Sequence, residues 1–230
     1  MNKLLITIVA VSTLIFGTTA FALTLDEAKA NIDKQATEKK LDARDHSQAT
    51  ATLHSLVEKG VPVEHAYRVV EASMDQGMKG KDLAAVARSI EAAGGAKKEA
   101  AEVAAQAIQH KYTARETERM TNTYGKTVAA GAPADKTSQV MSGGINKGVG
   151  AGRIMAATNA YAGEIRSGTA PDKAAENAER TMDRERTMQH DPDRTRDRDH
   201  MGGDSGMDHG MDHGPGMGSG AGTGTGGSRR

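Results

Sequence analysis

The sequence contains no cysteine and very few aromatic side chains. Without cysteine, disulfide bonds, zinc-thiolate sites and a lipid-modified N-terminal cysteine are all excluded. Both phenylalanines lie within the first 22 residues, so the only other aromatic side chains are Tyr67, Tyr112, Tyr124 and Tyr161. We therefore expect a core built mainly from Ala, Val, Ile, Leu and Met, which permits close helix packing but gives less burial per residue than an aromatic core.

An excess of charge of one sign is also lacking, because 30 basic side chains stand against 30 acidic ones. Binding to nucleic acid would need a basic face or stripe combined with aromatic stacking groups, and the sequence shows neither. A nucleic-acid partner is therefore not expected.

The first 22 residues have the three parts of a secretory signal peptide: Lys3 near the start, an apolar run from Leu4 to Phe16, and a small-residue end at Ala22. We expect cleavage after Ala22. The alternative is an uncleaved anchor, but the run is shorter than the ~20 residues of a spanning helix and polar residues interrupt it. The sequence therefore predicts a periplasmic or secreted protein without stable membrane insertion after cleavage.

Helix breaks recur at a nearly fixed interval between about residues 47 and 188. The predicted breaks, 17 to 20 residues apart, are Gly60, Gly77, Gly94 or Gly95, Tyr112, Gly131, Gly148 and Gly168. Glycine suits the left-handed residue that ends a helix, and helix-start residues follow most breaks. These are prolines tolerated in a first turn and acids that face the positive end of the helix dipole: Pro62, Pro133, Pro171, Glu64, Glu99, Glu116, Asp135 and Asp172.

Apolar residues between the breaks follow a period near 3.6, which indicates helices with one buried stripe. The clearest sets are Val63, Ala66, Tyr67, Val70 and Met74; Leu83, Val86, Ala87 and Ile90; and Ile154, Thr158, Tyr161 and Ile165. Helices of this length cannot bury a stripe alone and must pack as antiparallel hairpins. The predicted fold is all-α, an array of short antiparallel helices in helical-hairpin repeats of about 35 residues, within the length range of units that stack into superhelices.

The chain divides into four predicted parts: a signal peptide (1–22), a polar helical lead-in (23–46), the all-helical domain (47–188) and a tail (189–230). Gly125, Gly143 and Gly144 fall inside predicted helices, which we expect to be bent, frayed or closely packed there. Residues 180–199 hold six arginines and six acids, a pattern of a solvated helix extension or a disordered strip. After His200 glycine dominates, which predicts a disordered Gly/Met/His-rich tail.

Three apparent enzyme motifs in the helical region do not meet the requirements of their chemistry. The Gly125-Lys126-Thr127 triplet lacks the earlier glycine and the preceding strand of a nucleotide P-loop. The glycines at 148, 150 and 152 have the wrong spacing and a helical context for a dinucleotide-binding loop. The histidines at 46, 54, 65 and 110 show no close pairing with one another, so structural roles are favoured. The sequence therefore predicts a protein that is not an enzyme.

The C-terminal tail concentrates metal-binding side chains over a short distance. Its thioether, imidazole and carboxylate donors are Met201, Met207, Met211, Met217, His200, His209, His213, Asp208 and Asp212. Thioether sulfur selects Cu(I) or Ag(I), whereas imidazole with carboxylate suits Cu(II), Ni(II) or Zn(II). The intervening glycines allow the backbone to fold tightly enough for several donors to meet one ion. These nine residues are the predicted metal ligands, with copper as the expected ion.

The units Met207-Asp208-His209-Gly210 and Met211-Asp212-His213-Gly214 resemble the Met-Asp-His repeats of bacterial periplasmic copper-resistance proteins. This resemblance covers only about residues 200–217 and implies copper binding or storage. The tail has two perfect copies and no accompanying oxidase or barrel domain, so the resemblance does not extend to catalysis. A tandem tetrapeptide also arises by replication slippage in a tolerant terminal tail, which is the alternative explanation.

Two functions are compatible with these features. The first is an exported protein that buffers or passes on copper, or silver or nickel, through its tail. The second is a helical scaffold that binds an envelope protein partner, with the tail as a spacer.

Overall fold

The computed structural model describes residues 23–189, and side-chain surroundings up to residue 184. The helices in this range are α1 (Leu25–Glu38), α2 (Ala43–Glu58), α3 (Val63–Asp75), α4 (Gly80–Glu91), α5 (Lys97–Gln109), α6 (Ala114–Ala129), α7 (Ala134–Asn146), α8 (Ala151–Arg166) and α9 (Pro171–Gln189), with a short 3-10 turn η1 (Gly94–Ala96) before α5. The described residues contain no strand. The prediction of an all-α array of short antiparallel helices is confirmed.

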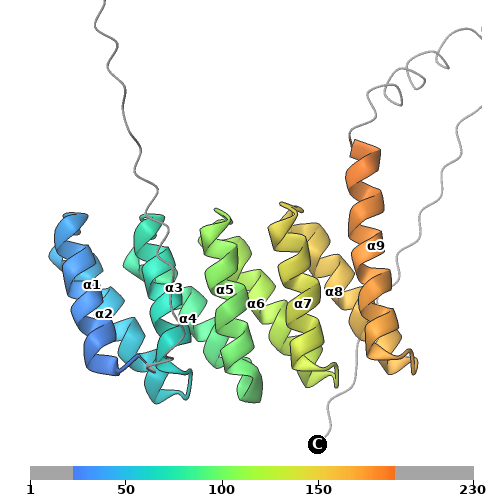
Figure 1. The fold of residues 1–230 in the computed structure, drawn as a ribbon, viewed down its shortest axis with the longest axis horizontal. Helices are drawn as coiled ribbons and strands as arrows, with labels where there is room; N and C mark the ends of the chain where they lie inside the picture. The colour runs from blue at the N-terminus through green and yellow to red at the C-terminus, as the bar shows by residue number, and fades with distance from the viewer. Residues whose placement is uncertain (1–22, 190–230) are drawn as a thin grey trace, which may run out of the picture. The chain divides into compact units, whose positions relative to one another are not determined.

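The helices form two layers, with the odd-numbered helices in front of the even-numbered ones in Figure 1. Helices two places apart in the chain pack on each other, so α3 contacts α5 and α4 contacts α6, and most helices also pack on a neighbour in the chain, as α1 does on α2. Successive helices of one layer are therefore one hairpin repeat apart. Among the described residues, no helix is both long enough and apolar enough to cross a bilayer.

Each of the first eight helices ends at a residue with positive φ. Six of these residues are the glycines at 60, 77, 94, 131, 148 and 168, which confirms the glycine breaks. The prediction at Tyr112 was wrong by one residue, because Lys111 adopts the left-handed conformation with φ 65°. Tyr112 follows it and donates its backbone N–H to the Ala107 carbonyl at 3.0 Å, the longer of the two hydrogen bonds of a Schellman motif.

The predicted lead-in, residues 23–46, contains α1 and the first turn of α2. Thr24 and Glu27 form a capping box, so two N–H groups at the start of α1 are satisfied reciprocally. The apolar side chains of Ala28, Ile32 and Ala36 are buried in the same core as the rest of the array. Helix α1 therefore completes a hairpin with α2, and the array starts upstream of residue 47.

The core consists of Ala, Val, Ile, Leu and Met side chains, as predicted, together with Tyr124 and Tyr161, which are fully buried. All four residues of the stripe in α4 are buried, whereas Val63, Tyr67 and Ile165 of the other two stripes are only partly buried. The apolar periodicity in the sequence therefore selected the correct helix faces.

The glycines inside helices do not interrupt them, because α6 and α7 are continuous. Two of them allow close packing. A Cβ atom at Gly144 would lie 2.8 Å from Ile154 Cγ1, and one at Gly125 would lie 3.2 Å from the Ala93 Cα. Of the three predicted outcomes, close packing is therefore the one that the structure shows at these two positions.

Side-chain bonds tie equivalent positions of successive repeats together. Lys39 pairs with Asp75 at 3.0 Å and Lys147 with Asp183 at 2.9 Å, and Gln35 donates to Glu71 at 3.1 Å. The two partners in each hydrogen bond of this kind lie about one repeat apart, for example 36 residues between Gln35 and Glu71. These polar contacts fix the register between hairpins, which apolar packing alone specifies less sharply.

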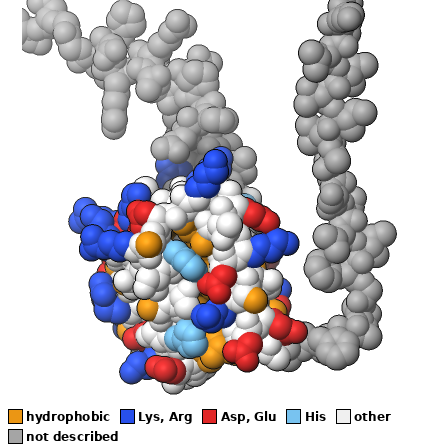
Figure 2. All heavy atoms as spheres, turned by 90° about the vertical axis from the view of Figure 1, so that its left-hand side faces the viewer, with side chains coloured by type: hydrophobic (Ala, Val, Ile, Leu, Met, Phe, Trp, Pro, Cys, Tyr) orange, Lys and Arg blue, Asp and Glu red, His pale blue; other side chains and the backbone are white. Residues whose placement is uncertain are grey.

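The first hairpin covers one end of the array with a mainly polar surface (Figure 2), lined by Lys29, Asp33, His46, His54 and Glu58 among others. Terminal repeats with a polar outer face protect the stacked core from water. The α1–α2 hairpin therefore acts as the N-terminal cap of the array.

Candidate functional site

The nine predicted metal ligands lie at residues 200–217, outside the described residues. Among residues 23–189, no group of three or more His, Cys, Asp or Glu side chains is placed to hold a metal ion. The tail metal site therefore stays a prediction from the sequence.

Two of the four histidines of the array pair with a carboxylate on a neighbouring helix. His46 Nε2 lies 2.7 Å from Asp33 Oδ1, and this hydrogen bond is the main reason that the pKa of Asp33 is lowered. His65 Nε2 lies 2.7 Å from Glu102 Oε1, and its other ring nitrogen is buried without a partner among the described residues. Because that nitrogen is shielded from solvent, His65 cannot use it on a surface-bound molecule, and the pair links α3 to α5.

The apparent nucleotide-binding triplet lies in the last turns of α6. Thr127 is buried, and Gly125 packs against Ala93 of the preceding turn. Of the second set of glycines, Gly148 ends α7, Gly150 precedes α8 and Gly152 lies within α8. Helix ends and helix packing thus account for Gly125, Gly148 and Gly150, whereas Gly152 lies in the first turn of α8 with open space around it.

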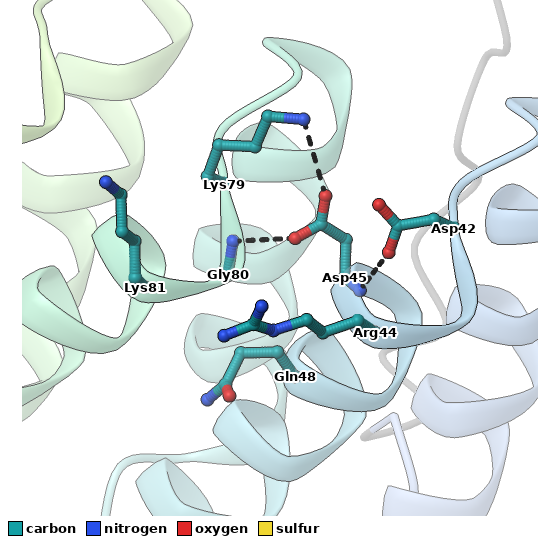
Figure 3. A pocket seen from close by; sticks show the side chains of 7 residues that line it. All are labelled: Asp42, Arg44, Asp45, Gln48, Lys79, Gly80 and Lys81. Carbon is teal, nitrogen blue, oxygen red and sulfur yellow. Dashed lines mark hydrogen bonds and ion pairs between the residues drawn. The ribbon is translucent and has the colours of Figure 1, made fainter.

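A pocket of about 370 Å³ lies where α2 and α4 begin side by side (Figure 3). Asp42 caps α2 by accepting the Asp45 N–H at 2.7 Å. Asp45 in turn accepts the Gly80 N–H at 3.0 Å, and Lys79 Nζ lies 3.6 Å from its other oxygen. The carboxylate of Asp45 therefore already occupies the positive end of α4.

Close packing explains why glycine stands at the start of α4. A Cβ atom at Gly80 would lie 2.6 Å from Gln48 Cγ on α2. The Asp45–Gly80 hydrogen bond beside this contact joins the same two helices through residues 35 apart, the separation of one repeat. This pocket is thus a structural joint between the first two repeats.

A second surface groove lies between α3 and α5, with a volume of about 460 Å³. Both of its carboxylates are engaged: Glu71 accepts from Tyr67 at 2.9 Å, and Glu102 bonds to His65. The Glu71 carboxylate and burial both raise the pKa of Tyr67, with burial the larger cause. The His65–Glu102 bond joins α3 to α5, so the carboxylates of this groove contribute to the internal structure of the odd-numbered layer.

A third groove, between α6 and α8, differs from these in its charge. It has a volume of about 430 Å³ and is lined by Arg119, Asn122, Thr123, Lys126, Gly152, Met155, Ala156 and Asn159. No carboxylate lines it, whereas the grooves described above each contain at least two acids. We call it the α6–α8 groove.

The sequence-based predictions did not include the α6–α8 groove. The sequence does contain one sign of this groove: Asn122 and Asn159 are 37 residues apart. Tyr112 and Val149, which are joined by a hydrogen bond between successive repeats, have the same separation. A residue that recurs at the repeat length occupies the same position on successive helices of one layer. Aligning the repeats would therefore have placed these two amides side by side.

Comparison with known proteins yields no match: no family model, no curated protein and no solved structure is similar to this chain. The architecture therefore defines the class, a two-layer array of helical hairpins, and functional proposals rest on the residues themselves.

Proposed function

We propose that this is an exported, non-enzymatic protein that handles copper through its C-terminal Met/Asp/His segment, buffering the ion in the periplasm or passing it on. The observation that carries the proposal is the pair of tandem Met-Asp-His-Gly units at 207–214. Methionine sulfur binds Cu(I), and imidazole with carboxylate binds Cu(II), so the segment can retain copper in both oxidation states. Thioethers also suit an oxidising compartment, where an exposed thiol tends towards disulfide formation.

The test compares the full mature chain, starting at residue 23, with a variant in which Met207, His209, Met211 and His213 are all replaced by alanine. A matched control replaces Thr223 and Thr225, which offer no soft or imidazole donor in the same tail. Titration with Cu(I), Cu(II), Ag(I) and Ni(II) should give affinity for Cu(I) at least about tenfold weaker in the fourfold variant, about 1.4 kcal/mol. Equal copper uptake by all three proteins would overturn the proposal.

The second candidate function is an interaction module of the cell envelope, in which the array binds a protein partner and the tail is a spacer. The α6–α8 groove favours this candidate, because its two amides have no hydrogen-bond partner and its two cations form no ion pair within the described residues, although the charge of Glu116 acts on Arg119. The corresponding test is affinity capture from envelope extracts with the mature chain and with the fourfold tail variant. A partner that binds saturably and equally to both proteins supports this function, and loss of the partner with the tail variant contradicts it.

A further inference from the structure

The α6–α8 groove presents two side-chain amides at equivalent positions of neighbouring helices. Asn122 of α6 and Asn159 of α8 both line it. Within the described part of the chain, neither amide has a hydrogen-bond partner. An amide side chain offers one acceptor and two donors, which match the C=O and N–H of a peptide backbone. Two such amides, one per helix, therefore form a short ladder across the layer.

Two cations flank the Asn122 amide on α6. Arg119 lies three residues before it and Lys126 four residues after it, so all three share one helix face. Neither cation forms an ion pair with another residue of the described range, although Glu116, three residues before Arg119, interacts with its charge at longer range. Without a direct ion pair, the guanidinium of Arg119 and the ammonium of Lys126 can both contact an anionic partner.

Two small residues, Gly152 and Ala156, line the α8 side of the groove. A Cβ atom at Gly152 would meet nothing within 4 Å, unlike one at Gly144, so internal packing does not require this glycine. Gly152 is the second residue of α8, in its first turn. Together with Ala156, it leaves the surface beside Asn159 open to the close approach of a backbone.

We propose that the α6–α8 groove binds an extended peptide segment that carries two consecutive acidic residues. The axes of packed helices such as α6 and α8 lie ~8–10 Å apart. In an extended peptide, a residue and the second residue after it are about 7 Å apart, and the asparagine side chains can span the remaining distance. The backbone groups of two such residues would therefore meet Asn122 and Asn159. Because side chains of an extended chain alternate in direction, one acid would point towards Arg119 and the next towards Lys126. This inference rests on the interaction-module candidate and specifies its partner.

The experiment measures fluorescence anisotropy of a labelled peptide, Gly-Ser-Thr-Asp-Glu-Thr-Ser-Gly, titrated with the mature full-length protein. An otherwise identical peptide with Asn-Gln in place of Asp-Glu tests the charge requirement and should bind at least about tenfold more weakly. Two double variants, Asn122→Ala with Asn159→Ala and Arg119→Ala with Lys126→Ala, should each weaken binding of the acidic peptide by about tenfold, which is about 1.4 kcal/mol. The matched control, Arg44→Ala with Lys81→Ala, removes two cations of the Figure 3 pocket and should change binding by less than about twofold. Circular dichroism verifies that each variant remains folded.

The inference is overturned if the acidic peptide fails to bind saturably, or if the control weakens binding as much as the groove variants. Its failure is distinguishable from failure of the interaction module. If a protein partner is captured equally by the native chain and by the Asn122/Asn159 double variant, the interaction-module function is supported and peptide binding in the α6–α8 groove is refuted. If no protein binds saturably to the native chain, the module itself fails.

Discussion

Two adjacent glycines in α7 should respond in opposite directions to the same substitution. In Gly143→Ala, the added Cβ atom would meet only Glu179 Oε1, at 3.7 Å, an ordinary contact distance. In Gly144→Ala, the added atom would lie 2.8 Å from both Ile154 Cγ1 and Met182 Sδ. The methionine end is flexible, but the isoleucine is β-branched and fully buried, so α7 and α8 must move apart or the side chain must leave its rotamer.

The magnitude follows from comparing the two positions. Both substitutions replace a helical glycine by alanine and so gain about 0.5–1 kcal/mol from reduced backbone entropy in the unfolded state. That gain cancels in the difference between the variants, which leaves the overpacking cost of about 1–3 kcal/mol at Gly144. We expect Gly143→Ala to be stabilised by about 0.5–1 kcal/mol and Gly144→Ala to be less stable than it by about 2 kcal/mol.

The assay is equilibrium urea unfolding of the mature protein and both variants, monitored by circular dichroism, with the midpoint and slope fitted for each. Similar slopes are needed for the comparison, because a changed slope reports altered compactness or loss of two-state behaviour. If Gly144→Ala is as stable as Gly143→Ala, then close packing of α7 on α8 and α9 is not the reason for glycine at that position.

Three further substitutions or titrations test other parts of the structure. Lys111→Gly should raise the free energy of unfolding by about 0.5–1 kcal/mol, because φ at this residue is 65° and glycine adopts that conformation without a Cβ clash; an unchanged or lower thermal midpoint would contradict this. Thr113→Ala should cost about 1 kcal/mol at pH 7 through loss of the α6 cap. This deficit should be smaller at pH 3. Hydrogen bonds from the Thr113 backbone N–H and, to a smaller extent, its hydroxyl lower the pKa of Glu116 below its usual 4.5, and the variant removes only the hydroxyl bond. The stabilisation from that bond is present above pH 4.5 and is lost as the carboxylate is protonated, so an equal deficit at both pH values would refute the link. Burial raises the pKa of Tyr124 above its usual 10, so this phenol should stay protonated above pH 10 in the folded protein. Its contribution to stability is fully present below pH 10 and is lost as the pH rises from 10 through the folded value; ultraviolet absorbance showing all four tyrosines titrating near 10 before unfolding would oppose this.

Helix ends were predictable because they depend on local backbone chemistry. Glycine at 60, 77 and 131 ends a helix through its own access to positive φ, without help from distant residues. Lys40 and Lys111 perform the same role with a side chain that disfavours it, so the sequence offered no comparable signal there. The polar composition of residues 23–46 predicted a separate lead-in, whereas α1 packs on α2 in the structure.

The candidate sites were less predictable than the helices, because they depend on which helices stack. The contact of Asp45 with Gly80 and the pairing of His65 with Glu102 join residues about one repeat apart. Neither pair has a local sequence signature. The metal donors of the tail are the opposite case. Their short spacing is visible in the sequence alone, and the residues themselves lie outside the described part of the chain.

The sequence by itself determined the all-α class, most helix boundaries, the buried stripes and the composition of the core. The apolar periodicity and the helix-ending residues on which these depend are local properties of a few residues. Only the tertiary structure decided which glycines are required for packing and which polar groups remain unsatisfied. Gly144 and Gly152 are indistinguishable as letters, yet one lies against Ile154 and the other faces open space. Asn122 and Asn159 likewise become one surface feature only when hairpins stack in register, since the distance between helices of a layer is set by packing across a whole repeat.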